Sequence, residues 1–117
     1  MSKYSSDLSV ILQALADPTR RAIIERLARG PASVSELALP FGMALPSIVA
    51  HLHKLEAAGL ITSEKDGRVR TCALQPQALA PVHDWLQDQR VLWDSRLDRL
   101  ETYLQTLTKE PNDADRP

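Results

Sequence analysis

The three histidines and the single cysteine are the residues of this chain with ligand chemistry, and their spacing argues against a metal site. His51 and His53 are two positions apart on a predicted helix, so their side chains point about 200° from each other and cannot bind one ion together. His83 and Asp84 are neighbours, whereas side chains that share a helix face are three or four positions apart. We therefore predict neither a metal site nor a cofactor. His51 is expected to lie beside the outer helix face, where it binds a phosphate or caps a carbonyl.

Cys72 has no partner for an internal disulfide, because it is the only cysteine of the chain. It lies in a predicted strand, where a lone cysteine is usually a small buried hydrophobe. The alternative is a redox switch, which would require an intermolecular disulfide or an exposed thiolate. A glycine-rich phosphate loop, a nucleophile motif and a convergent carboxylate pair are all missing from the sequence. We predict that the protein is not an enzyme.

Cationic side chains are concentrated in the middle of the chain. Residues 18–75 contain eight Lys/Arg against five Asp/Glu, whereas residues 76–117 contain five against eight. Lys65, Arg68 and Arg70 surround Asp66-Gly67, a dipeptide typical of a tight hairpin turn in which both residues have positive φ. Arginines at a hairpin tip suit the narrow minor groove of DNA or its flanking phosphates. The alternative is a charged hairpin that only contacts solvent.

The length of 117 residues and the hydrophobic fraction of 44% indicate one domain with its own core. The N-terminus has no signal-peptide run, and no stretch approaches the roughly 20 apolar residues of a membrane helix. We expect a cytoplasmic protein with no membrane contact. Within a single domain over 1–117, the expected parts are a core at 6–76, helices at 77–108 and a disordered tail at 109–117.

Apolar periodicity and helix start signals predict the elements that position these residues. Asp17 before Pro18 starts one helix, and Ser33 with Glu36 has the spacing of a capping box. Helices are predicted over 6–16, 18–29, 33–40 and 45–58, and again over 77–108 with a break near Gln89. Segments 60–65 and 68–74 are predicted to pair as a β-hairpin.

The order of two helices across a tight turn followed by a hairpin is that of a winged helix-turn-helix. The predicted fold class is therefore mainly α with one β-hairpin, with helical dimerisation elements at both termini. In the second helix of the pair, Ile48, Leu52 and Leu55 face the core, which places the opposite face outward. That outer face would enter the major groove of double-stranded DNA.

The chain resembles the ArsR-type family of bacterial repressors over about residues 8–108. The resemblance lies in five motifs in the family's order: Ala14–Arg21, Glu36–Ala38, Met43–Pro46, His51–Ile61 and Gly67–Arg70. The stretch Leu92–Leu100 is similar to a branch of the family without metal sites. The resemblance implies a homodimer that binds an inverted-repeat operator, often overlapping its own promoter.

Three positions depart from the family pattern. The family commonly has serine at the positions of Ala44 and Val49, and lysine or arginine at the position of Ala50. The side chains expected to contact DNA are Leu45, Pro46, Ser47, Val49, Ala50, His51, His53 and Lys54 on the helix, and Lys65, Arg68 and Arg70 on the hairpin. The apolar substitutions leave two alternatives open, namely a protein-interaction module with weak or no DNA binding and a metal-responsive repressor with an atypical site.

A seven-residue apolar repeat near the C-terminus predicts a helix that needs a partner helix. The expected dimer interface consists of Leu8, Ile11 and Leu12 in the first helix and Leu86, Trp93, Leu97, Leu100, Leu104 and Leu107 in the last. Trp85 and Trp93 could instead line the pocket of a small-molecule effector, whose identity the sequence does not indicate.

Overall fold

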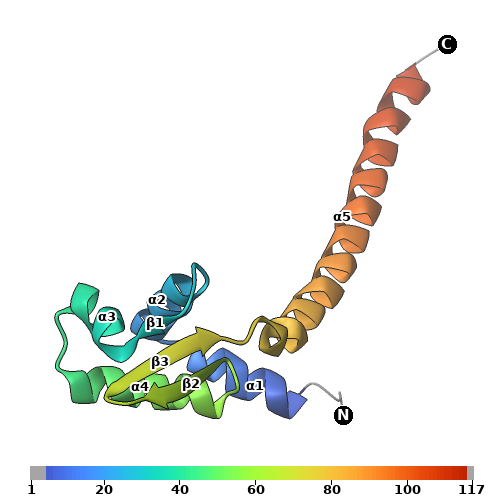
Figure 1. Ribbon diagram of the computed structural model, residues 1–117. Helices are drawn as coiled ribbons and strands as arrows, with labels where there is room; N and C mark the ends of the chain where they lie inside the picture. The colour runs from blue at the N-terminus through green and yellow to red at the C-terminus, as the bar shows by residue number, and fades with distance from the viewer. Residues whose placement is uncertain (1–4, 116–117) are drawn as a thin grey trace. The chain divides into compact units, whose positions relative to one another are not determined.

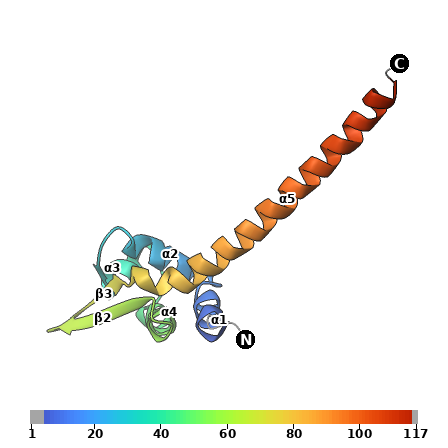
Figure 2. The ribbon, with the colours of Figure 1, turned by 90° about the vertical axis from the view of Figure 1, so that its right-hand side faces the viewer.

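The computed structural model describes residues 5–115 and divides into two compact units after His83 (Figure 1). The elements in chain order are α1 (Ser5–Ala14), α2 (Pro18–Leu27), β1 (Ala32–Ser33), α3 (Val34–Ala38), a 3-10 turn (Leu39–Phe41), α4 (Leu45–Ala57), β2 (Ile61–Asp66), β3 (Val69–Leu74), a second 3-10 turn (Pro76–Leu79) and α5 (Ala80–Asp115). Helices α3 and α4 are followed by the β2–β3 hairpin, which contacts α4 through β2 and whose tip projects away from α4 in Figure 2. This is the predicted winged helix-turn-helix. No single helix among the described residues is both long and apolar enough to cross a membrane.

The sheet has three strands rather than the two that the sequence predicted. Strand β3 lies between β2 and β1 and pairs antiparallel with both. In β1, Ala32 pairs with Cys72 and Ser33 pairs with Thr71. Two residues are too few to show a strand period, so this long-range pairing has no local signal.

The hairpin turn differs from the prediction by one residue. Asp66 pairs with Val69, so the two turn residues are Gly67 and Arg68. Gly67 has a φ of 64°, and positive φ occurs only at glycines among the described residues. The expectation that Asp66 also adopts positive φ was therefore wrong. A two-residue turn with glycine first is the other common hairpin class, and it places Arg68 at the tip.

The core of the first unit is assembled from the inner faces of α1, α2, α3 and α4 and from the sheet. Ile48, Leu52 and Leu55 are buried on α4, as the helical period predicted. Cys72 is 1% exposed and lies among the buried residues of this core, which confirms its prediction as a small hydrophobe. Burial raises the pKa of its thiol above the ordinary value, so Cys72 is neutral at physiological pH.

The starts of α2 and α3 follow the predicted capping chemistry. The Asp17 carboxylate accepts a hydrogen bond from the backbone N–H of Arg20 at 3.0 Å. Ser33 and Glu36 form both bonds of a capping box, at 3.1 and 3.0 Å. These backbone donors lower the pKa of Asp17 and of Glu36 below their ordinary values.

Arg20, one of the eight Lys/Arg counted in residues 18–75, is a buried cation. The residue is only 9% exposed. Its Nε donates a hydrogen bond to the carbonyl oxygen of Ala14. Its Nη2 donates to the carbonyl of Gln13 at 3.1 Å, and its Nη1 lies 3.4 Å from Nδ1 of His51. One guanidinium thus joins the last turn of α1 to the start of α2 and to α4.

Helix α5 is continuous through Gln89, so the predicted break at that residue was wrong. It extends to Asp115 and includes residues 109–115, which the sequence analysis assigned to a disordered tail. Residues 116–117 lie outside the described part of the chain. At 1.5 Å per residue, its 36 residues make a helix about 54 Å long.

Candidate nucleic-acid interface

The outer face of α4 is exposed over its whole length. Pro46, Ala50, His53 and Ala57 are exposed on the side opposite the buried residues, as the helical period predicted. Ser47 and Lys54 are exposed on its flanks, Leu45 is 51% exposed, and Val49 is half-buried. The structure therefore brings seven of the eight predicted helix residues to one surface.

His51 is the exception. Its Nδ1 lies 3.4 Å from Nη1 of Arg20 and 3.8 Å from the Asp17 carboxylate. The Nδ1 edge of the ring therefore faces Arg20 of α2 and the N-cap residue Asp17, a contact that the prediction of a phosphate or carbonyl partner did not include. Sequence reasoning missed this contact because the residue pairs with an element 31 positions away.

Helix α4 begins without a side-chain cap. Ala44 is the N-cap residue, with φ −63° and ψ 147°, and no side-chain hydrogen bond is made there. The carbonyl of Ala44 accepts bonds from the amides of Ser47 and Ile48 at 3.0 and 3.3 Å. The backbone is thus already in the cap conformation, and only the side-chain acceptor is missing.

Replacing Ala44 by serine should stabilise the protein by about 1 kcal/mol, because the hydroxyl can accept a hydrogen bond from the Ser47 amide, whose present partner is the Ala44 carbonyl. Urea unfolding followed by circular dichroism measures this change. The matched control is Ala50→Ser, the same replacement at an exposed position inside the helix, where serine is slightly unfavourable. Equal effects of the two substitutions would contradict the capping interpretation.

The cations of the β2–β3 hairpin differ in whether their side chains have a hydrogen-bond partner within the hairpin. Lys65 and Arg68 are exposed near the tip. Arg70 is also exposed, but its Nη1 donates to Oγ of Ser63 at 2.9 Å, and that hydroxyl lies 3.4 Å from both carboxylate oxygens of Glu56. Sequence reasoning did not select Glu56 or Ser63, because only the register of the hairpin against α4 brings them to Arg70.

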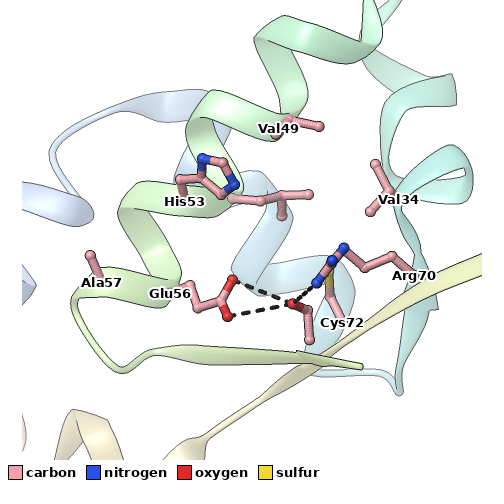
Figure 3. Close-up of a pocket in the computed structure, with 9 residues that line it drawn as sticks. Val34, Val49, His53, Glu56, Ala57, Arg70 and Cys72 are labelled. Atoms are coloured by element: carbon pink, nitrogen blue, oxygen red, sulfur yellow. Dashed lines mark hydrogen bonds between the residues drawn. The ribbon is translucent and has the colours of Figure 1, made fainter. Parts of the chain in front are cut away.

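Two grooves lie between α4 and the hairpin. One has a volume of about 620 Å³ and is shown in Figure 3; its lining includes His53, Glu56 and Arg70. The other has a volume of about 460 Å³ and is lined by Ser33, Val34, Ser35, Leu45, Val49, Arg68, Val69 and Arg70. Val34, Val49 and Arg70 line both grooves, so the two hollows are adjacent and lie between the basic side chains of the hairpin and α4.

The residues predicted for a dimer interface fall into two groups. Leu8 and Ile11 are buried within the first unit itself, 9% and 4% exposed, so Ile11 is a core residue, contrary to the prediction. Leu12 is 42% exposed. Val10, which the predicted interface did not include, is also exposed, at 49%. On α5 the six predicted residues are each 43–60% exposed: Leu86, Trp93, Leu97, Leu100, Leu104 and Leu107.

Among the described residues, no group of three or more His, Cys, Asp or Glu side chains is arranged to bind a metal ion. His53 is exposed on the outer face of α4, whereas His51 contacts α2. The two side chains thus point to different surroundings, as their spacing predicted.

Trp85 and Trp93, the two tryptophans considered for an effector pocket, are 40% and 60% exposed.

The sequence and the structure are similar to those of bacterial transcriptional regulators. Residues 15–64 match the family model described as a helix-turn-helix domain. The HTH-type transcriptional regulator Rv2034 of Mycobacterium tuberculosis is 47% identical over 70 residues, which cover 60% of this chain and 65% of that protein. The transcriptional repressor SdpR of Bacillus subtilis is 30% identical over 76 residues, which cover 65% of this chain and 84% of the repressor. This chain therefore spans just under two thirds of the length of the first of these relatives.

Two solved structures extend the likeness to the three-dimensional fold. A crystal structure of an ArsR family transcriptional regulator superimposes with a TM-score of 0.76 at 56% identity, covering 81% of this chain and 98% of the other. The homodimeric winged helix-turn-helix DNA-binding domain Mb0332 of Mycobacterium bovis superimposes with a TM-score of 0.59 at 26% identity, covering 79% of this chain and 82% of the other.

Proposed function

The chain belongs to the ArsR family of winged helix-turn-helix transcriptional regulators, and we propose that it is a homodimer that binds an inverted-repeat operator and represses transcription. The family is one of transcriptional regulators, not of enzymes. The observation that carries the proposal is the exposed outer face of α4 bordered by the cations of the β2–β3 hairpin. Because a transcriptional regulator of a bacterial family must reach the cell's DNA, we also propose a cytoplasmic location.

In the proposed complex, α4 enters the major groove and the hairpin contacts the flanking minor groove or phosphates. The proposed contacts on α4 are Leu45, Pro46, Ser47, Val49, Ala50, His53 and Lys54, and those on the hairpin are Lys65, Arg68 and Arg70. His51 is left out of this set because its ring nitrogen faces Arg20 and Asp17. Two copies related by a twofold axis would read half-sites about one helical turn, or 10 bp, apart.

We assign dimerisation to α5, with a contribution from the exposed residues of α1. The apolar side chains of α5 repeat every seven residues and are exposed in the single chain. A contiguous apolar stripe of this length usually marks an interface. The relative from Mycobacterium bovis is homodimeric, which supports a dimer for this chain.

A mobility-shift assay with the DNA upstream of the protein's own coding sequence tests the function directly. We expect binding that weakens steeply with salt, because Lys and Arg displace counterions from the phosphates. Arg68→Ala should lower the slope of log K against log salt by about 2, since each of the two protomers loses one phosphate contact. Arg29→Ala removes another exposed cation, just after the C-cap of α2, and should leave the slope unchanged.

One observation favours a second candidate function, a protein-interaction module. Four residues at the start of α4 and on its outer face are apolar: Ala44, Leu45, Val49 and Ala50. The protein-interaction function would be supported if substitution of Lys54, Arg68 and Arg70 by alanine leaves DNA binding unchanged while a purified partner protein binds α4.

The apolar outer face of α4 also predicts how bases are read. Val49 and Ala50 can make only apolar contacts, and the best apolar group in the major groove is the thymine methyl. We therefore expect an operator rich in A·T, in which replacing thymine by uracil at the contacted steps weakens binding by about 1 kcal/mol or more per step. Quantitative mobility shift on matched thymine and uracil half-sites measures this. Unchanged affinity, or a selected operator with guanine at those steps, would contradict it.

A further inference from the structure

The larger groove between α4 and the hairpin has the size of a small-molecule site (Figure 3). Its volume of about 620 Å³ lies within the range of ligand pockets, roughly 300–1,000 Å³. Such pockets are mostly apolar and contain a few polar groups that fix the orientation of the ligand. The exposed lining of this groove is divided about equally between an apolar wall and a polar rim, so it is more polar than a typical ligand pocket.

The apolar wall is formed by Val34 from α3, Val49 and Leu52 from α4, and Cys72 from β3. Cys72 is 1% exposed, and burial raises the pKa of its thiol. The nearby carboxylate of Glu56 raises that pKa further, while Arg70 opposes the effect. The thiol therefore contributes to the wall as a neutral, weakly polar group.

The polar rim contains one guanidinium with unused donors. Arg70 donates from Nη1 to Ser63 at 2.9 Å, which is its one side-chain hydrogen bond among the described residues. A guanidinium carries five N–H donors in a planar fork, so it can still bind a carboxylate through two parallel bonds. His53 lies on the same rim and can donate a further hydrogen bond.

Arg70 and Glu56 are the two charged side chains of the lining, and Arg70 favours an anion whereas Glu56 repels one. The Glu56 carboxylate is approached by the Ser63 hydroxyl at 3.4 Å, so the two charges act from the two ends of one polar cluster. An anion pairs with Arg70 and leaves this contact in place. An ammonium group, in contrast, would have to displace Ser63 from Glu56 while lying beside the Arg70 guanidinium.

We propose that this groove binds a small apolar carboxylic acid, anchored by Arg70, and that the bound acid weakens operator binding. The second half of the proposal rests on the proposed function, because Val49, His53 and Arg70 are also proposed DNA contacts. An acid on Arg70 removes a phosphate partner and adds a negative charge beside the DNA. By linkage, the operator weakens binding of the acid by the same factor.

The test of binding uses the full chain without DNA and three probes of the same shape. Methyl-labelled protein is titrated with 1-naphthoate, 1-naphthylmethylamine and 1-naphthalenemethanol, and the methyl signals of Val34, Val49 and Leu52 are followed by NMR. We expect saturable shifts with the carboxylate and at least tenfold weaker binding of the alcohol and the amine. Tighter binding of the amine or the alcohol, or no saturable shift with the carboxylate, overturns the proposal.

Two arginine variants separate the anchor from the general charge of the hairpin. Arg70→Gln should weaken naphthoate binding at least tenfold, whereas Arg68→Gln should not, since Arg68 does not line this groove. Because neither titration contains DNA, this result stands whether or not the protein binds an operator. Equal losses in the two variants overturn the assignment of Arg70.

The coupling to DNA is measured separately, on whichever operator fragment the chain binds. Saturating naphthoate should lower operator affinity about tenfold in the unmodified chain and leave it unchanged in Arg70→Gln. Acid binding without any change in DNA affinity would overturn the regulatory half of the proposal. Failure of the unliganded protein to bind DNA would instead contradict the proposed function, and the NMR titration still decides whether the groove is a site.

Discussion

Replacing Leu100 by glutamate should convert the protein from a dimer to a monomer at micromolar concentration. Leu100 lies within the stripe that runs along α5 from Leu86 to Leu107 and is 52% exposed in the single chain. In a symmetric dimer the substitution places two carboxylates in one apolar interface. Burying an unpaired charge costs several kcal/mol per ion. We therefore expect the dissociation constant of the dimer to rise at least 100-fold, measured by sedimentation velocity.

Val91 provides the matched control for this substitution. It is 59% exposed on the same helix, and nine residues at 100° each place it about 180° from Leu100. Val91→Glu adds the same charge to the opposite side of α5, so the dimer should persist. If both variants become monomeric, or neither does, α5 does not dimerise through the proposed stripe.

The same pair of variants tests whether DNA binding depends on the dimer. Two linked recognition units gain roughly 10²–10⁴-fold in affinity over one. Leu100→Glu should therefore weaken operator binding at least 100-fold while the circular dichroism spectrum stays unchanged. Val91→Glu should bind like the unmodified protein. An unchanged affinity in a monomeric Leu100→Glu variant would rule out the paired reading of half-sites.

Replacing Arg20 by alanine should destabilise the protein by about 3 kcal/mol. The substitution removes the two bonds to the carbonyls of Gln13 and Ala14 and leaves both acceptors in a partly buried turn. Hydrogen bonds from a charged donor contribute roughly 1.5–3 kcal/mol each. Urea unfolding with an unchanged m-value measures the loss, which is a large part of the roughly 5–15 kcal/mol total of a typical domain.

Arg21, the next residue, is the control. It also donates to a main-chain carbonyl, that of Leu15 at 2.7 Å, but in an exposed position. Arg21→Ala should therefore cost less than about 1 kcal/mol. Arg20→Lys should recover only part of the loss, because one ammonium cannot reproduce the planar fork that contacts two carbonyls. Equal losses for Arg20→Ala and Arg21→Ala would show that burial of the guanidinium does not matter.

Local patterns were sufficient to predict most of the helix-turn-helix. The inner face of α4 followed from the spacing of Ile48, Leu52 and Leu55, which has the helical period. The caps at Asp17 and Ser33 followed from residue types at fixed offsets, because a cap involves only residues within one turn. The hairpin followed from Asp66-Gly67, although the turn itself is one residue further along, since register depends on which residues pair across the strands.

Several features that the sequence analysis missed depend on residues from separate elements of the fold. The strand β1 exists only because Ala32 and Ser33 reach β3, and His51 is drawn inward by Arg20, 31 positions away. Arg70 meets Ser63 and Glu56 because the hairpin lies beside α4.

The sequence by itself thus determined the family, the order of the elements and the outer face of α4, since period, capping and turn chemistry are properties of neighbouring residues. Only the tertiary structure decided that Arg20 is buried, that Ile11 belongs to the core and that a groove lies between α4 and the hairpin. The physical reason is that burial and side-chain partners depend on how separate elements pack, and no local pattern records that packing.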